Sequence, residues 1–215
     1  MVIMDKKIVE EFVQKKLIND RSGHDFMHVQ RVVNMALKLS DQIPVSDKDI
    51  VLLSAYLHDI IDEKVVDDVD KAKILLNEKL NQWNISSSKI GKIFEIIENI
   101  SFSKNFEKKY KLPIEGQIVQ DADRIDAIGA VGIARAFYYG GYIGNPIYDT
   151  KFSVQSNLTE KSYREENTVI NHFHEKLLKL EELMNTDIAK DIAKERTIFM
   201  RDFLKRFYQE WNGEK

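Results

Sequence analysis

The chain has 215 residues, a length that fits one domain and allows a sizeable buried core. Its formal net charge of −3 excludes a strong overall attraction to nucleic acid or an anionic membrane. It does not exclude a local basic pocket, because net charge does not describe how charges are distributed. The absence of cysteine excludes disulfides, iron–sulfur clusters and thiolate zinc sites. The sequence lacks the apolar stretches of a membrane span or a signal peptide, so we expect a cytoplasmic protein.

The first half of the chain has apolar residues at helical spacing and little strand-like alternation, which predicts an all-α fold. In the second predicted helix, Ser22 can act as the N-cap, and Asp25, three residues later, can complete a capping box. Pro44 separates this helix from the next one, which is almost continuously apolar before it reaches His58 and Asp59. The helices predicted in this half span residues 5–19, 22–42, 46–61, 68–83 and 87–100.

The second half begins with a strongly apolar helix that is predicted over residues 115–138. Residues 140–160 carry several glycines and few periodic apolar residues, so we expect a long loop, and loops of this length are often functional. Helices near 161–184 and 187–210 close the chain, and no repeat or linker divides it. The expected single domain, 1–215, consists of a core over about 20–138, the loop over 140–160 and C-terminal helices over 161–210.

Histidines near the ends of predicted helices are the first candidates for chemistry. His24 and His28 are four residues apart on the same predicted helix, so we expect them on one face. His58 is followed directly by Asp59 at the end of an apolar helix, where a charged carboxylate must be paired, bound to a cation or directed into a cavity. Each feature also has a purely structural interpretation, because a histidine can cap a helix and a His-Asp pair often binds nothing.

Three aspartates, Asp121, Asp123 and Asp126, interrupt the apolar helix of the second half. Carboxylates in a largely buried helix need a compensating cation, which can be a metal ion or arginine side chains such as Arg124 and Arg135. Together with the histidines and the His-Asp pair, this helix supplies a set of two imidazoles and two carboxylates. Such a set suits Mn²⁺, Mg²⁺ or Fe²⁺ with open positions for water.

The order His28, then His58-Asp59, then Asp123 resembles the H…HD…D pattern of the HD superfamily of metal-dependent phosphohydrolases. The likeness is closer still to bacterial HD-domain hydrolases of the YpgQ/YedJ type, and it spans nearly the whole chain. The segments that carry it cover residues 24–32, 57–64, 121–129 and 140–149. The resemblance implies an all-α HD-domain helical bundle with additional C-terminal helices. It also implies an enzyme that cleaves a phosphate ester or anhydride, with a nucleotide as the expected substrate.

The resemblance implies a fourth ligand, and Asp123 is favoured over Asp121 because many HD proteins place this ligand in an Ala-Asp-Arg or Ala-Asp-Lys step. Asp25, Asp121 and Asp126 are then expected to orient the ligands as hydrogen-bond acceptors. HD proteins with two metals carry further histidines between the His-Asp pair and the last aspartate, and residues 60–120 contain none. We therefore expect one divalent ion, Mn²⁺ or Mg²⁺, with Fe²⁺, Co²⁺ or Ni²⁺ as alternatives.

Residues beside these motifs are candidates for catalysis and substrate binding. Asp62 and Glu63 follow the His-Asp pair and can accept a proton from the attacking water, whereas their structural interpretation is a solvated helix end. His24 can contact phosphate, bind a second metal or cap its helix. The loop over 140–149 can cover the site as a lid or simply connect the core to the C-terminal helices. The cations and tyrosines expected at phosphate and base are Arg21, Lys64, Arg124, Tyr142 and Tyr148.

Three functions are consistent with the residues. The first is a nucleoside triphosphate pyrophosphohydrolase or phosphatase. The second is a non-catalytic HD domain that senses a nucleotide, which the intact ligand set disfavours because a sensor needs no activated water. The third is a di-iron oxygenase, which the scarcity of histidines disfavours. We expect a phosphorylated small molecule as the partner, rather than a nucleic acid polymer or a membrane, and the sequence leaves the oligomeric state open.

Overall fold

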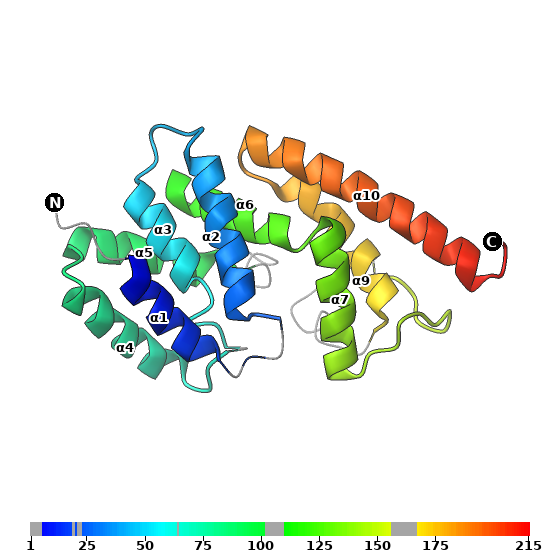
Figure 1. The fold of residues 1–215 in the computed structure, drawn as a ribbon, viewed down its shortest axis with the longest axis horizontal. Helices are drawn as coiled ribbons and strands as arrows, with labels where there is room; N and C mark the ends of the chain where they lie inside the picture. The colour runs from blue at the N-terminus through cyan, green and yellow to red at the C-terminus, as the bar shows by residue number, and fades with distance from the viewer. Residues whose placement is uncertain (1–5, 19, 21–22, 64, 102–109, 156–166) are drawn as a thin grey trace. The chain divides into compact units, whose positions relative to one another are not determined.

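The computed structural model describes residues 6–18, 20, 23–63, 65–101, 110–155 and 167–215 (Figure 1). All regular elements in these ranges are helical, which confirms the predicted all-α fold. None of the helices within them is long and apolar enough to cross a membrane. The chain forms two compact units, Met1–Ala122 and Asp123–Lys215, which are described separately below. The expected single domain stays a prediction.

The first unit is built around helix α3, Lys48–Leu57, which packs against α1, α2 and α5. Its apolar side chains are buried, and Leu53 and Leu57 have no exposed surface. Burial of one leucine contributes about 1.5–3 kcal/mol relative to exposure, so α3 is held firmly on several sides. The helices around it are α1 (Lys6–Leu17), α2 (Phe26–Ser40), α4 (Val69–Gln82) and α5 (Ser87–Asn99), close to their predicted ranges.

The N-terminus of α2 differs from the prediction. The helix begins at Phe26, and Asp25 is its N-cap, with a side chain that accepts a hydrogen bond from the His28 backbone N–H at 2.8 Å. Ser22, the expected cap, lies outside the described residues. His24 therefore precedes the helix, and the prediction that His24 and His28 share a helical face is wrong. Asp25 suits this position because an aspartate is among the strongest N-cap residues.

The long helix predicted over 115–138 is in fact two helices, α6 (Ile114–Asp126) and α7 (Gly129–Ile143). The chain turns at Gly129, whose φ of +77° lies in the left-handed region that glycine adopts without strain. The apolar pattern runs on through this break, so periodicity alone did not reveal it.

The end of α7 overturns part of the predicted loop over 140–160. Residues 140–143 are helical, and Gly144, at φ +80°, is the left-handed C-cap that ends the helix. A Cβ atom at Gly140 would overlap a methyl group of Val169, so this glycine serves close packing of α7 against α9. Residues 156–160, the end of the predicted loop, lie outside the described residues.

The second unit contains α7, α9 (Val169–Glu175), a 3₁₀ helix η2 (Leu177–Leu183) and α10 (Asp187–Trp211). Helix α10 packs against α7 and η2, as Figure 1 shows, and it matches the helix predicted over 187–210. The helix predicted near 161–184 is wrong in form, because an α-helix of one to two turns is followed by a 3₁₀ segment. Its first part, 161–166, lies outside the described residues.

Candidate metal centre

Three side chains of the first unit bring one donor atom each to a common point. His28 Nε2 lies 3.2 Å from His58 Nε2 and 3.4 Å from Asp59 Oδ2, and His58 Nε2 lies 3.2 Å from the same oxygen. Ligands about 2.1 Å from a metal ion, at angles between octahedral and tetrahedral, lie about 3.0–3.4 Å from one another. The three donor atoms therefore have the spacing of one face of a metal coordination sphere. All three residues are buried.

His58 is held by the end of the helix that carries it. The residue is the C-cap of α3, and its Nδ1 lies 2.8 Å from the Ala55 carbonyl oxygen. A carbonyl only accepts, so Nδ1 carries the proton and Nε2 keeps its lone pair. This hydrogen bond fixes both the tautomer and the ring orientation that a metal ligand requires.

Asp59 carries a buried charge that the protein alone does not satisfy. Its Oδ2 is buried and has no hydrogen-bond partner. Burial by itself would raise the pKa of Asp59, but the neighbouring imidazoles of His58, His24 and His28 hold that pKa well below its usual value. An ionised oxygen of this kind, facing two imidazole nitrogens, fits a divalent cation, which would compensate the buried charge.

His24 lies beside the cluster although it is not on α2. Its ring meets the His28 ring edge to face with centroids 6.0 Å apart, and its backbone N–H donates to Asp20 Oδ2 at 2.8 Å. The charge of His24 also lowers the pKa of Asp59. His24 therefore lies beside His28, as expected, although the two residues do not share a helix. Its role toward phosphate stays a prediction.

The three aspartates of α6 have different surroundings. Asp121 is fully buried, whereas Asp123 is partly exposed. Asp126 is buried and forms an ion pair with Arg135 Nη1 at 2.8 Å, so the arginine alternative holds for this residue. Asp123 is the first residue of the second unit, whereas His28, His58 and Asp59 belong to the first. Its role as the fourth ligand, and the ligand-orienting roles of Asp25, Asp121 and Asp126, stay predictions.

The two proposed proton acceptors follow α3 in a turn. Because α3 ends at Leu57, the helical spacing that was expected to place Asp62 and Glu63 near Asp59 does not apply. Asp62 is partly buried, and its backbone N–H donates to the Asp59 carbonyl at 3.1 Å, whereas Glu63 is exposed. Asp62 is therefore the better placed of the two, and its role stays a prediction.

The residues expected to contact the substrate differ in what the structure shows of them. Arg21 and Lys64 lie outside the described residues. Arg124 donates from Nη1 to the Leu183 carbonyl, an interaction within the second unit. Tyr142 is 59% exposed on α7. Tyr148 has ring contacts with three aromatic side chains of α10: Phe207, Tyr208 and Trp211. These contacts account for Tyr148 without a ligand, so Tyr142 is the stronger candidate for stacking.

Sequence reasoning missed two groups at or near the predicted ligands. One is the Ala55 carbonyl, which could have been found had the C-cap of α3 been placed at His58, because the last carbonyls of a helix lack backbone donors. The other is Arg196, whose Nη1 donates to the Ile125 carbonyl at 2.6 Å. No motif in the sequence distinguished this arginine from the other charges of α10.

A helical core in which a histidine of one helix meets a His-Asp pair at the end of another defines an HD domain. The sequence profile of the HD domain family matches residues 25–128, a range that contains all three clustered residues. The chain belongs to this family.

Three relatives extend the match over nearly the whole chain. The uncharacterized protein YpgQ of Bacillus subtilis (strain 168) is 35% identical over 206 residues, or 95% of this chain and 93% of YpgQ. Its crystal structure in complex with ADP has a TM-score of 0.76 and 31% identity, and covers 96% of this chain and 97% of that chain. A Lactobacillus plantarum crystal structure has a TM-score of 0.89 and 42% identity, over 99% of both chains. An HD-superfamily hydrolase from Bacillus thuringiensis has a TM-score of 0.75 and 36% identity, over 96% of both chains.

Proposed function

We propose that this protein is a metal-dependent phosphohydrolase that cleaves a phosphate anhydride or ester of a nucleotide. The observation that carries the proposal is the cluster of His28, His58 and Asp59, with a buried carboxylate oxygen that lacks a hydrogen-bond partner. The nucleotide is supported by YpgQ, a relative of nearly equal extent whose crystal structure holds ADP. The hydrolase class is supported by the Bacillus thuringiensis relative.

The ligand set would hold one divalent ion, Mn²⁺ or Mg²⁺, through His28, His58, Asp59 and Asp123. Such an ion, when bound, lowers the pKa of water and polarises a phosphoryl oxygen. The protein residues supply the rest: the Ala55 carbonyl keeps the His58 lone pair directed at the cluster. A carboxylate after the His-Asp pair, Asp62 in preference to Glu63, would accept the proton of the attacking water.

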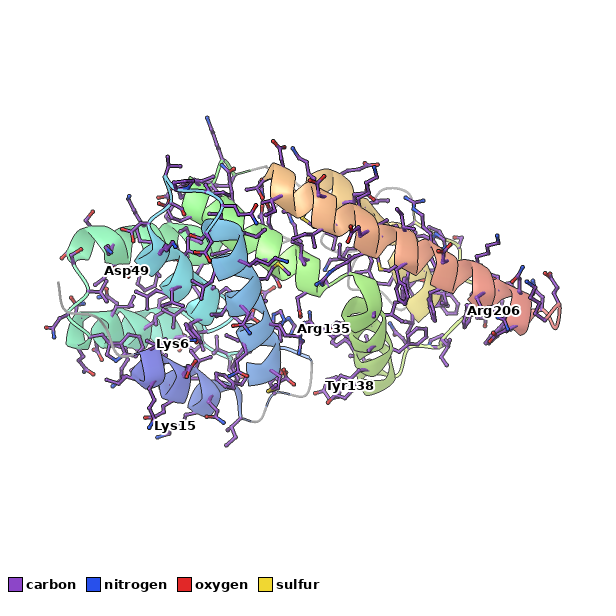
Figure 2. The ribbon with its side chains drawn as sticks, turned by 45° about the horizontal axis from the view of Figure 1, so that its top comes forward. Lys6, Lys15, Asp49, Arg135, Tyr138 and Arg206 are labelled. Atoms are coloured by element: carbon purple, nitrogen blue, oxygen red, sulfur yellow. The ribbon has the colours of Figure 1, made fainter. Side chains whose placement is uncertain are left out.

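The substrate would be held by cations at its phosphates and by a tyrosine at its base. His24, beside His28, is the described residue best placed for a phosphate oxygen, and Arg21 and Lys64 are proposed with it. Tyr142 and Tyr138 are one turn apart on α7, are each nearly 60% exposed, and offer two ring faces for stacking. Figure 2 marks Tyr138 on this helix.

Turnover on a nucleotide panel tests the proposal. Purified protein is stripped with EDTA, supplied with Mn²⁺, Mg²⁺ or Co²⁺, and incubated with nucleoside mono-, di- and triphosphates, and the products are identified. We expect metal-dependent release of phosphate or pyrophosphate, which His58→Ala and Asp59→Ala abolish. If the protein binds nucleotides but cleaves none of them with any of these ions, it is a nucleotide sensor and not an enzyme.

A further inference from the structure

The junction between α6 and α7 is held by an arginine from a distant part of the chain. Arg196, on α10, donates from Nη1 to the Ile125 carbonyl at 2.6 Å and to the Ile128 carbonyl at 3.5 Å. In a continuous α-helix, the Ile125 carbonyl would accept the backbone N–H of Gly129. The Ile125 carbonyl instead accepts from the Ile128 N–H at 3.3 Å and from Arg196, which thus supplies the shorter of its two hydrogen bonds at the point where α6 stops. All of these residues belong to the second unit.

The backbone around this arginine is closely fitted to it. Gly129 has a left-handed φ of +77°, and a Cβ atom there would lie 3.0 Å from Arg196 Cγ. The aliphatic stem of Arg196 thus lies directly over the glycine. A Cβ atom at Gly132 would overlap the Ala127 carbonyl, so the first turn of α7 also rests on the backbone of the junction. Gly129 is required by its left-handed φ, and Gly132 by the close approach of the Ala127 carbonyl.

Charges from three helices meet at the same junction. Arg196 is partly buried, and burial lowers its pKa while Asp126 acts to raise it. Asp126, at the end of α6, is paired with Arg135 of α7. A guanidinium in such a position must have its donors satisfied, since an unpaired buried charge is costly. The two carbonyls at the junction accept from Nη1 of this guanidinium.

The last turn of α6 also contains Asp123. The Asp123 carbonyl accepts from the Ala127 N–H at 3.2 Å, and the Arg124 carbonyl shares the same donor at the same distance. This shared hydrogen bond tightens the turn just before the junction. Any shift of residues 125–129 is therefore transmitted to the backbone of Asp123 through one hydrogen-bonded turn.

We propose that Arg196 is a positioning residue for the metal centre: by ending α6 at Asp126, it fixes the backbone from which the Asp123 carboxylate extends. The inference rests on the proposed function, in which Asp123 is the fourth ligand. It assigns Arg196 no contact with substrate or with the ion.

Mn²⁺ titration of the full chain by calorimetry tests the inference. Arg196→Met keeps the stem over Gly129 and removes the guanidinium, whereas Arg196→Lys restores one donor. The matched control is Asn171→Ala, which removes buried amide hydrogen bonds to the Phe152 carbonyl and to Asn167 in the same unit. Thermal unfolding of the metal-free proteins, kcat and KM are measured alongside.

We expect Arg196→Met and the control both to lower Tm, but only Arg196→Met to weaken Mn²⁺ binding, by about 10–100-fold, as for other residues that orient ligands. Its kcat should fall at saturating Mn²⁺ with KM little changed, and Arg196→Lys should recover part of the affinity. Wild-type Mn²⁺ affinity in Arg196→Met, or equal weakening by Asn171→Ala, would overturn the inference. Absence of nucleotide turnover in the wild type would instead remove the proposed function, and the Mn²⁺ titrations would still decide the role of Arg196.

Discussion

The imidazole Nδ1 of His58 lies 2.8 Å from the carbonyl oxygen of Ala55, one turn earlier in the same helix. That contact makes Nε2 the ring nitrogen that keeps its lone pair and directs it toward His28 and Asp59. The helix end thus supplies the orientation that many metal sites obtain from a separate residue.

Metal binding should stabilise the protein through this cluster. At a free Mn²⁺ concentration about 100 times the Kd, binding should raise the free energy of unfolding by about 2.7 kcal/mol. For a chain of this size, that corresponds to a Tm rise of about 5–10 °C. His58→Ala and Asp59→Ala should show no such rise in differential scanning calorimetry. His174→Gln, which changes a histidine of the second unit, should keep the wild-type rise. A normal Tm rise in either ligand variant would mean that the ion binds elsewhere.

The choice between the two aspartates of α6 can be decided by charge removal. Asp123→Asn keeps the shape of the side chain, so it should abolish turnover and weaken Mn²⁺ binding more than 100-fold if Asp123 is a ligand. Asp121→Asn should cost about 10–100-fold, as residues that orient ligands do. Calorimetric titration of both variants gives the ranking. The opposite ranking would assign the ligand to Asp121, which is fully buried in the unit that contains the histidines.

If the nucleotide base stacks on Tyr142 of α7, removal of this ring should change KM. Tyr142→Ala should raise KM for the nucleotide about 5–100-fold, because base–aromatic stacking contributes about 1–3 kcal/mol. Mn²⁺ affinity should stay at the wild-type value. Tyr142→Phe is the matched control, since it keeps the ring and loses only the hydroxyl, and its KM should be close to wild type. Unchanged KM in Tyr142→Ala would place the base at another surface.

The second unit should lose stability in mild acid through His174. Its Nε2 lies within hydrogen-bond distance, 2.9 Å, of the Tyr208 hydroxyl. Burial lowers the pKa of His174, Glu175 acts to raise it, and Arg201 lowers it further. The folded-state pKa is therefore below the unfolded value of about 6.5, so this stabilisation is complete above that value and is lost as pH falls through the folded pKa.

Thermal unfolding across this pH range checks the sign. His174→Gln can still accept from Tyr208 but does not titrate, so its Tm should fall less than that of the wild type between about pH 7 and pH 5. Parallel pH profiles for the two proteins would exclude His174 as the titrating group.

Most helices of the first unit could be predicted from the sequence, for a physical reason. Apolar periodicity located α3, and the His-Asp pair at its end stood out because a charge there requires a partner. The clustering of His28 with His58 and Asp59 followed from the family pattern, and the structure confirms it. Gln42 and Ile61 were placed beyond the true helix ends, which lie at Ser40 and Leu57, because apolar periodicity does not mark the residue at which helical hydrogen bonding stops.

What the sequence could not predict depends on contacts between distant residues. Gly129 looked like one more residue in an apolar helix, and only its left-handed φ and the stem of Arg196 show that the helix stops there. Gly140 and Gly141 suggested a loop, although Gly140 is helical and leaves room for the Val169 side chain that packs against it. Tyr148 was expected to stack on a nucleotide base, whereas its ring contacts aromatic side chains of α10 that are about 60 residues away along the chain.

The proposed metal centre can be tested directly with a crystal of the protein soaked in Mn²⁺ and measured at a wavelength where manganese scatters anomalously. We predict one anomalous peak per chain, about 2.0–2.3 Å from His28 Nε2, His58 Nε2 and Asp59 Oδ2. The same soak of Asp59→Ala crystals should leave that position without a peak. Wild-type crystals with no anomalous density between His28 and Asp59 at saturating Mn²⁺ would show that these residues do not bind the ion.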